Sequence, residues 1–321
     1  MQYWRYWAGA LAFAVPVFAF AQAYPSRPIR LVIPFSPGGN ADTLCRTASQ
    51  KVSESIGQQI VIDNRSGANG NIGMEIVARA APDGYTFVLG YIANVAIAPS
   101  LMSKLPYDPV KDYAPISQLA SSPNIIVVHS AVPARNMKEL IALSKGKPKS
   151  INFSSAGVAS VGHLTGELFN TALGAELQHV PYKGSGQGVI DLVAGQIQML
   201  IGGMSSVMPH IKTGRLRAIA VTGAQRSPAM PDVPTVAESV LPGFEATAWY
   251  GVLAPAGTPR AIVSRLHSEY ARALALPEVK QRLENLGFEI VASTPDVFAA
   301  YIKTEIVKWA KVVKASGAKA Q

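Results

Sequence analysis

The chain has 321 residues, of which 49% are hydrophobic and 15% are charged. This length suggests two domains at roughly 150 residues each, and the apolar share is too large for a disordered chain. With 29 Lys and Arg against 20 Asp and Glu, the net charge is +9, so nucleic acid, a membrane surface and acidic small molecules are the partners to consider. Because Cys45 is the single cysteine, an intramolecular disulfide is excluded, and we interpret Cys45 as a small buried hydrophobic residue.

The first 23 residues have the pattern of a secretory signal peptide. Arg5 precedes an apolar run over 8–21, and small residues permit cleavage after Ala21 or after Ala23. A membrane anchor is disfavoured because a spanning helix needs about 20 apolar residues, and Pro16 interrupts this shorter run. Removal of Arg5 with the signal leaves the exported chain at a net charge of +8.

Strands and helices alternate along the exported chain. The first part predicts strands over 29–33, 59–62 and 85–89 with helices over 40–56 and 74–80, an order typical of a parallel sheet with right-handed crossovers. Asn40 is expected to cap the first helix. The second part predicts strands over 124–128, 151–153, 178–180, 199–201 and 216–221, and helices over 159–171 and 188–194.

Two helices close the chain, and two segments connect the predicted units. Thr258-Pro259 and Thr294-Pro295 predict the starts of helices that end near 274 and 315. Strand-like segments near 116–128 and 246–253 suggest that the chain crosses between two lobes twice. We therefore predict that residues 24–123 and 249–321 form lobe 1 and that residues 124–248 form lobe 2. Ligands bind outside the carboxyl ends of such strands, which places the site in the cleft between the lobes.

Motif searches exclude several kinds of site. The sequence has no nucleophile elbow and no phosphate-binding P-loop, and 184–188 only approaches the dinucleotide fingerprint. The five histidines lack the spacing of a metal-binding pair. The lysine clusters at 145–149 and 308–319 lack the interleaved aromatic residues of nucleic-acid binders. We therefore predict no catalytic residue, no metal, no cofactor and no nucleic-acid partner.

Two Gly/Ser-rich turns are the informative feature. The segments 34–40 and 154–160 each follow a predicted strand and open a predicted helix. The free N–H groups at a helix start carry about half a positive charge, so a carboxylate can bind there without a cationic side chain. Either turn alone is explained as a simple strand-to-helix connection. Their equivalent positions in two lobes favour an anion site.

A set of motifs extends over nearly the whole exported chain. They are YPSRPIRLVIPFSPGG at 24–39 with Asp42, DNRSGANGNIG at 63–73, PDGYT at 82–86, GHL at 162–164 with Glu167, HVPYKG at 179–184, PDVPT at 231–235, WYG at 249–251 and APAGTP at 254–259. Together they resemble the motifs of the solute receptors of tripartite tricarboxylate transporters, often called Bug receptors.

The resemblance implies an α/β fold of the two-lobed periplasmic binding protein type (type II-like). Each lobe would be a mostly parallel sheet flanked by helices, with the ligand in the interlobe cleft. It implies a monomeric periplasmic receptor, not an enzyme, that captures an organic carboxylate by cleft closure and delivers it to the inner-membrane permease subunits of the transporter. A secreted carboxylate sensor that feeds a signalling system is an alternative, and a secreted hydrolase is another.

The resemblance also implies a set of ligand-binding residues from both lobes. Those of the first lobe are Phe35, Ser36, Pro37, Gly38, Gly39 and Asp42. Those of the second lobe are Ser154, Ser155, Gly157, Ser160 and His163. By their positions after strands, we expect the cleft also to include Tyr91, Asn94, Gly203 and Met204.

Several roles stay open at the level of sequence. His163 can donate to a ligand carboxylate or act as a local helix cap. Tyr182 and Lys183 can reach the cleft or shape a turn, and Trp249-Tyr250 can pack in a crossover segment or gate the cleft.

The ligand class follows from a departure from the family pattern. Many family members carry an acidic residue where neutral residues stand at 196–198, and 202–205 is also neutral. No carboxylate is therefore evident to meet an ammonium group. This departure favours a dicarboxylate, or an aromatic carboxylate resting against Phe35, Tyr91 or Met204, over an amino acid.

Overall fold

The computed structural model describes residues 24–102 and 104–316. The predicted signal peptide lies outside the described residues. The elements in chain order are β1 (Ile29–Ile33), α1 (Asn40–Ile56), β2 (Ile60–Asn64), η1 (Ala68–Gly70), α2 (Asn71–Ala78), β3 (Thr86–Tyr91), η2 (Ala93–Ile97), α3 (Ala98–Leu101), β4 (Tyr113–His129), α4 (Met137–Gly146), β5 (Ile151–Ser155), α5 (Val161–Leu173), β6 (Leu177–Pro181), α6 (Ser185–Val193), β7 (Met199–Gly203), α7 (Met204–Lys212), β8 (Leu216–Val221), α8 (Val236–Ser239), β9 (Thr247–Pro255), α9 (Arg260–Ala275), α10 (Pro277–Glu284), β10 (Glu289–Ile290) and α11 (Pro295–Ser316). Within the described ranges, none of these helices combines the length and the apolar character that a membrane crossing requires.

The first sheet has the strand order β2-β1-β3-β9-β4, with β10 added against β4. β1 pairs in parallel with both β2 and β3, which confirms the predicted order of parallel strands. β9 runs antiparallel between β3 and β4. The four apolar residues of β1 lie between prolines and are fully buried, as expected of a central strand covered on both faces, whereas Arg30 is half-exposed and paired with Asp63.

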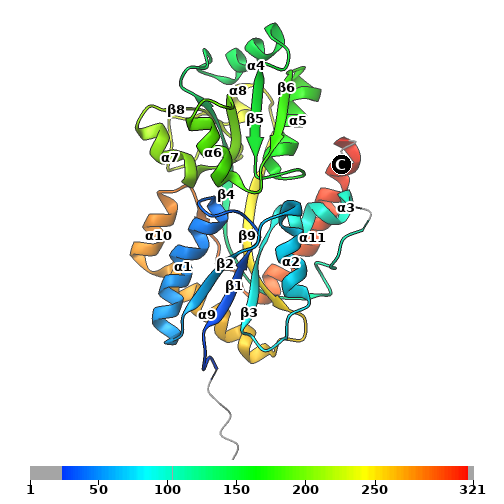
Figure 1. The fold of residues 1–321 in the computed structure, drawn as a ribbon, viewed down its shortest axis with the longest axis vertical. Helices are drawn as coiled ribbons and strands as arrows, with labels where there is room; N and C mark the ends of the chain where they lie inside the picture. The colour runs from blue at the N-terminus through cyan, green and yellow to red at the C-terminus, as the bar shows by residue number, and fades with distance from the viewer. Residues whose placement is uncertain (1–23, 103, 317–321) are drawn as a thin grey trace, which may run out of the picture.

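The second sheet shares β4 with the first. β5 pairs in parallel with β6 and β7, and β4 runs antiparallel to β7 and β8. The 17-residue strand β4 pairs with β9 up to Pro123 and with β7 from Asn124 onward. Figure 1 shows the resulting two lobes, one above the other, with β4 and β9 passing between them. The predicted lobe boundaries at 123/124 and 248/249 fall inside these two strands and stay a prediction.

The helices surround each sheet separately. In Figure 1, α1, α2 and the C-terminal helices α9, α10 and α11 lie around the lower sheet, whereas α4 to α8 lie around the upper one. One hydrophobic core fills the lower lobe and two clusters lie on the faces of the upper sheet. Cys45 belongs to the lower core and is fully buried, which confirms its interpretation as a hydrophobic residue, and burial raises the pKa of its thiol.

Most element boundaries agree with the sequence, but two predicted caps are wrong. α1 ends at Ile56 as predicted, with Gly57 as its C-cap, yet its N-cap is Gly39, and the Asn40 side chain makes no capping bond. The Asn40 amide instead contacts the second lobe, as described below. α9 has Pro259 as its N-cap, because the Thr258 hydroxyl donates to the Pro255 carbonyl oxygen (2.7 Å) rather than accepting from the helix.

The last helix is attached to the crossover strand by a buried carboxylate. Glu305 of α11 is 4% exposed and accepts hydrogen bonds from the indole N–H groups of Trp249 and Trp309, both at 3.1 Å. Trp249 lies on β9, so this carboxylate connects α11 with a strand that passes between the lobes. Ile302, Trp309 and Val313 of α11 are also buried, and Tyr301 and Ile306 are half-buried.

Replacement of this carboxylate should therefore cost stability. Glu305→Ala leaves two buried indole N–H groups unpaired, each at about 1–3 kcal/mol, so we expect the free energy of unfolding in urea to fall by roughly 2–4 kcal/mol. Glu305→Gln keeps one acceptor oxygen and should lose less. Equal unfolding free energies for the two variants would show that the indole hydrogen bonds contribute nothing.

Candidate functional site

A small cavity lies between the two lobes, at the carboxyl ends of the central strands. Its volume is about 30 Å³, enough for roughly two water molecules. The lining residues are Phe35, Ser36, Gly39, Asn40, Ala41, Tyr91, Asn124, Ala156, Gly162, Gly184, Ser185, Ile201, Gly202, Gly203 and Tyr250. They come from both lobes and from the shared strand β4, so the lobes must be together for this cavity to exist.

Four helices begin at this cavity. The lining includes the N-caps of α1 in the lower lobe and of α6 and α7 in the upper lobe, and Gly162, the second residue of α5. This convergence follows from chain direction, because a helix that comes after a parallel strand starts at the strand's carboxyl end. Each helix start carries a partial positive charge, and the N–H groups of its first turn have no partner within the helix itself.

No lining side chain is charged. The polar groups are hydroxyls and amides, and the aromatic rings of Phe35, Tyr91 and Tyr250 pack against one another with ring centroids 5.2–5.4 Å apart. Burial raises the pKa of Tyr91 and of Tyr250 above the ordinary value, so both hydroxyls stay protonated near neutral pH. The wall thus consists of neutral hydrogen-bonding groups in the field of four helix starts.

Asn40 connects the lobes through its side-chain oxygen. This oxygen accepts from the backbone N–H of Ser205 (3.0 Å) and from the Ser205 hydroxyl (2.5 Å) at the start of α7. Because a backbone N–H can only donate, the Asn40 amide has a fixed orientation, with its NH₂ group 3.4 Å from the Ser122 hydroxyl. The Asn40 side chain is also hydrogen-bonded to the Tyr250 hydroxyl.

Two further hydrogen bonds cross between the lobes at the cavity wall. The Ser36 N–H donates to the Lys183 carbonyl oxygen at 3.0 Å, and the Tyr91 hydroxyl is hydrogen-bonded to the backbone N–H of Val161. The loops approach so closely that a Cβ on Gly186 would lie 2.3 Å from the carbonyl oxygen of Pro37. The structure is therefore a closed arrangement of the two lobes.

The predicted site residues divide into two groups by position. Those that line the cavity are Phe35, Ser36, Gly39, Tyr91 and Gly203. Those that do not are Pro37, Gly38, Asp42, Asn94, Ser154, Ser155, Gly157, Ser160, His163 and Met204. Most of the second group lie directly behind the wall and hold it in place.

Asp42 and Asn94 support the lower wall from behind. The Asp42 carboxylate accepts from the Gly38 N–H (3.1 Å), the Arg46 guanidinium (2.9 Å) and the Asn64 amide (3.1 Å). Burial alone would raise the pKa of Asp42, but these hydrogen bonds outweigh it and place the pKa below the ordinary value. Asn94 is fully buried, and its side-chain oxygen accepts from the Tyr91 N–H at 2.9 Å.

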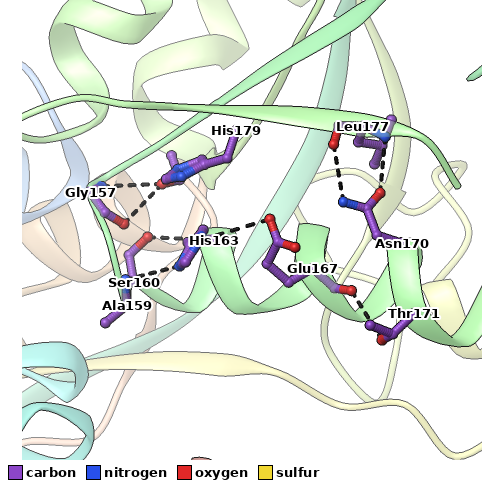
Figure 2. Close-up of polar contacts among 10 residues, drawn as sticks. Gly157, Ala159, Ser160, His163, Glu167, Asn170, Thr171, Leu177 and His179 are labelled. Atoms are coloured by element: carbon purple, nitrogen blue, oxygen red, sulfur yellow. Dashed lines mark hydrogen bonds and ion pairs between the residues drawn. The ribbon is translucent and has the colours of Figure 1, made fainter. Parts of the chain in front are cut away.

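The upper wall is supported by a cluster of polar side chains shown in Figure 2. Ser160 is the N-cap of α5 and accepts from the His163 N–H at 3.3 Å. The His163 ring accepts from the Ala159 N–H at 3.0 Å and stacks on His179 of β6. The contacts of the His163 ring are thus local to the start of α5. Met204, at the start of α7, is fully buried and lies against Gly287.

The two neighbouring residues whose roles the sequence left open also have clear contacts. The Tyr182 hydroxyl donates to the Asp191 carboxylate (2.6 Å), and burial raises the pKa of Tyr182 to about 12. Lys183 reaches the other lobe through its carbonyl oxygen rather than through its ammonium group.

Ten lining residues were not among the predicted site residues. The sequence predicts Asn40 as a helix cap, leaves Tyr250 open between packing and gating, and presents Gly184-Ser185 only as part of an incomplete dinucleotide fingerprint. A usable signal existed for the last pair, because 184–188 also follows a strand and opens a helix, as 34–40 and 154–160 do. Asn124 lies inside a continuous strand, and nothing in its sequence context marks it.

Metal ligands are not gathered in the part of the chain that the structure describes. Residues 24–102 and 104–316 contain no group of three or more His, Cys, Asp or Glu side chains placed to hold a metal ion.

Closure should be sensitive to a single methyl group at Gly203. This residue has φ −72° and ψ 145°, which alanine adopts without strain, but a Cβ would lie 2.1 Å from the Asn40 side chain. We expect Gly203→Ala to shift the protein toward a more open arrangement.

Electron paramagnetic resonance can measure this shift, with one spin-labelled surface cysteine on each lobe, since Cys45 is buried. Gly146→Ala is the control, because a Cβ there meets nothing within 4 Å. An unchanged distance distribution in Gly203→Ala would contradict the close approach at Asn40.

The half-buried His179 should make stability depend on pH. Burial and the neighbouring His163 lower the pKa of His179 from 6.5 to about 3. The unfolded chain therefore binds more protons than the folded chain between these values, and the free energy of unfolding falls as the pH drops from about 6.5 toward 3. The upper limit is about 1.4 kcal/mol per pH unit for one proton, reduced by solvent access to the ring.

Urea unfolding at pH 7, 6, 5 and 4 tests this contribution. His179→Gln does not titrate there, so its stability should fall less steeply than that of the wild type. Parallel curves for the two proteins would show that His179 is not buried in its neutral form.

Comparisons with known proteins agree with this arrangement. A family model described as "Tripartite tricarboxylate transporter family receptor" matches residues 44–318. Protein BugT of Bordetella pertussis is 38% identical over 307 residues, which are 95% of this chain and 94% of BugT. The structure of periplasmic binding protein BugD has 34% identity and a TM-score of 0.89, covering 93% of this chain and 100% of that chain. The structure of R. palustris Rpa4515 with adipate has 36% identity and a TM-score of 0.88, covering 92% and 98%.

The predicted fold is thereby confirmed, since two lobes of mixed α/β structure around a shared crossover are the fold of the periplasmic binding proteins in these comparisons. On the family match and on the extent of these similarities, the chain belongs to the family of tripartite tricarboxylate transporter receptors.

Proposed function

We propose that this protein is a periplasmic receptor that captures a small dicarboxylate between its lobes and delivers it to the permease subunits of a tripartite tricarboxylate transporter. The observation that carries the proposal is the convergence of four helix starts, from both lobes, on a cavity without a charged side chain. Fixed N–H groups in a buried, weakly polar space stabilise an anion and do not stabilise a cation.

A buried hydroxyl at the wall also supports an anionic ligand. Ser36 lines the cavity, and its hydroxyl oxygen is buried without a hydrogen-bond partner among the described residues. A buried hydroxyl without a partner costs free energy. A ligand oxygen would satisfy it.

The two walls suit a ligand with two carboxylates, although a cavity of about 30 Å³ must widen to admit it. α1 starts on the lower wall, and α5, α6 and α7 start on the upper wall. A dicarboxylate can present one carboxylate to each wall, so it binds the closed arrangement more tightly than the open one. A ligand favours closure only through such a difference in affinity. Adipate, the ligand in the R. palustris structure, has such a shape.

The aromatic alternative has less support. Tyr91 packs edge to face with Phe35 and at a tilt with Tyr250, so these rings already use part of their surface on one another. Met204, on which a ligand ring was also expected to rest, is fully buried and does not line the cavity. A zwitterionic amino acid is disfavoured for a different reason, because its ammonium group would meet no carboxylate in the lining.

Thermal unfolding against a panel of acids tests the proposal. The panel contains succinate, adipate, benzoate and glutamate. A ligand at about 100 times its Kd stabilises the folded state by roughly 2.7 kcal/mol, which raises the Tm by several degrees. We expect a dicarboxylate to do so. Binding of glutamate without binding of the plain carboxylates would overturn the proposed ligand class.

A charge-changing variant distinguishes a carboxylate site from a general effect of salt. Asn40→Asp keeps an oxygen that can accept from Ser205 but adds a negative charge to the cavity wall. We expect the affinity for the dicarboxylate, measured by isothermal titration calorimetry, to fall at least ten-fold (about 1.4 kcal/mol). Gly146→Ala should bind as the wild type does. Unchanged affinity in Asn40→Asp would place the ligand elsewhere.

A further inference from the structure

Two stacked histidines lie directly behind the upper wall of the cavity. The rings of His163, the third residue of α5, and of His179 on β6 have centroids 4.1 Å apart and planes 33° apart. Figure 2 shows the two rings facing each other between the helix and the strand. Neither ring lines the cavity, but the segment that they contact contributes Ala156 and Gly162 to its lining.

His163 holds the end of that segment in a strained conformation. Ala159 has φ +65°, in the left-handed region that costs free energy for a residue with a Cβ. Its N–H donates to Nδ1 of His163 at 3.0 Å. This bond requires Nδ1 to be unprotonated, so the neutral ring carries its proton on Nε2.

His179 acts on the other end of the segment through Ser155. Nε2 of His179 lies 2.7 Å from the Ser155 hydroxyl oxygen, which also accepts from the Gly157 N–H (3.2 Å) and lies 3.0 Å from the Gly157 carbonyl oxygen. A hydroxyl has one proton. All three contacts are hydrogen bonds when Nε2 of His179 donates, Ser155 accepts twice, and the Ser155 proton goes to the Gly157 carbonyl oxygen.

His163 is suited to this role only in the neutral form, because its Nδ1 must accept. A proton on Nδ1 of His163 would point at the Ala159 N–H, so the bond would be lost. Burial lowers the pKa of His163, and the carboxylate of Glu167, 3.8 Å from Nε2, opposes this shift. For His179, burial and the facing His163 ring both lower the pKa. Glu167 of α5 and the paired ring on β6 are thus the titratable groups that act on the pair.

We propose that His163 and His179 are positioning residues that hold residues 155–162 in the conformation that presents the start of α5 to the ligand. The expected effect on ligand affinity rests on the proposed function. The expected effect on the conformation of residues 155–162 does not. Each ring acts through one nitrogen: Nδ1 of His163 as an acceptor and Nε2 of His179 as a donor.

This division of roles provides matched variants. Asn at 163 places its amide oxygen near the position of Nδ1, and Gln at 179 places its amide NH₂ near the position of Nε2. His163→Asn and His179→Gln should therefore keep the hydrogen bonds that His163→Leu and His179→Leu remove. His267→Leu, on α9 of the other lobe, controls for the loss of a histidine as such.

Amide hydrogen exchange of the full exported chain without ligand is the first measurement. We expect exchange across 156–163 to accelerate at least ten-fold in the two Leu variants, to stay within about three-fold of the wild type in the Asn and Gln variants, and to be unchanged in His267→Leu. If a Leu variant does not fold, Ser155→Ala replaces it, because it removes only the hydroxyl between His179 and Gly157.

Affinity for the panel carboxylate that binds the wild type is the second measurement. We expect at least a ten-fold weaker Kd in the Leu variants and recovery in the Asn and Gln variants. Unchanged exchange in the Leu variants, or equal acceleration in all four variants, overturns the inference, and so does changed exchange with unchanged affinity. If no carboxylate binds the wild type, the proposed function fails, and the exchange experiment still decides whether the pair holds the segment.

Discussion

The direction of the strands determines where an anion can bind in this fold. Within each lobe the central strands are parallel, so each one ends at the edge of the sheet where the next helix begins. The two sheets face each other across β4 and β9, and the starts of α1, α5, α6 and α7 therefore meet at one cavity. The positive potential of the site comes from backbone geometry and needs no cationic side chain.

The same geometry makes ligand binding and lobe closure depend on each other. Asn40 and Tyr91 line the cavity and also form hydrogen bonds to the upper lobe, at Ser205 and Val161. These bonds exist only when the lobes are together. A ligand that touches both walls binds the closed arrangement more tightly than the open one. The hydrogen bonds between the lobes stabilise the same closed arrangement and so add to the stability of the complex.

The fold was largely predictable because its signals are local. β1 is an apolar run between prolines, α1 ends at a glycine in the left-handed conformation, and β8 matches its predicted range. Helix α4 was missed although Asn136 and Glu139 mark its start, since Asn136 accepts from the Glu139 N–H. Such local errors change a boundary or omit an element, and they leave the order of strands intact.

The site was less predictable because its wall is formed by contacts between distant segments. Asn40 has a residue type that caps helices, but its oxygen bonds to Ser205, 165 residues away, and no local pattern shows this preference. Tyr250 lies on a strand that is buried along its length, and only the closed lobes place its ring at the cavity. By contrast, the turns before α1 and α5 were found because their signal, glycine and serine between a strand and a helix, is local.

The basic surface and the uncharged cavity act at different ranges. Residues 24–321 carry a net charge of +8, yet the cavity lining has no Lys or Arg, and Asp42 behind it is paired with Arg46. Surface cations attract any acidic solute over about a Debye length, so they raise the encounter rate without selecting among acids. Selection requires groups of fixed position. Backbone N–H groups at helix starts cannot move to follow a misplaced oxygen as a lysine can, so under the proposed function they favour an acid whose carboxylates have the matching separation.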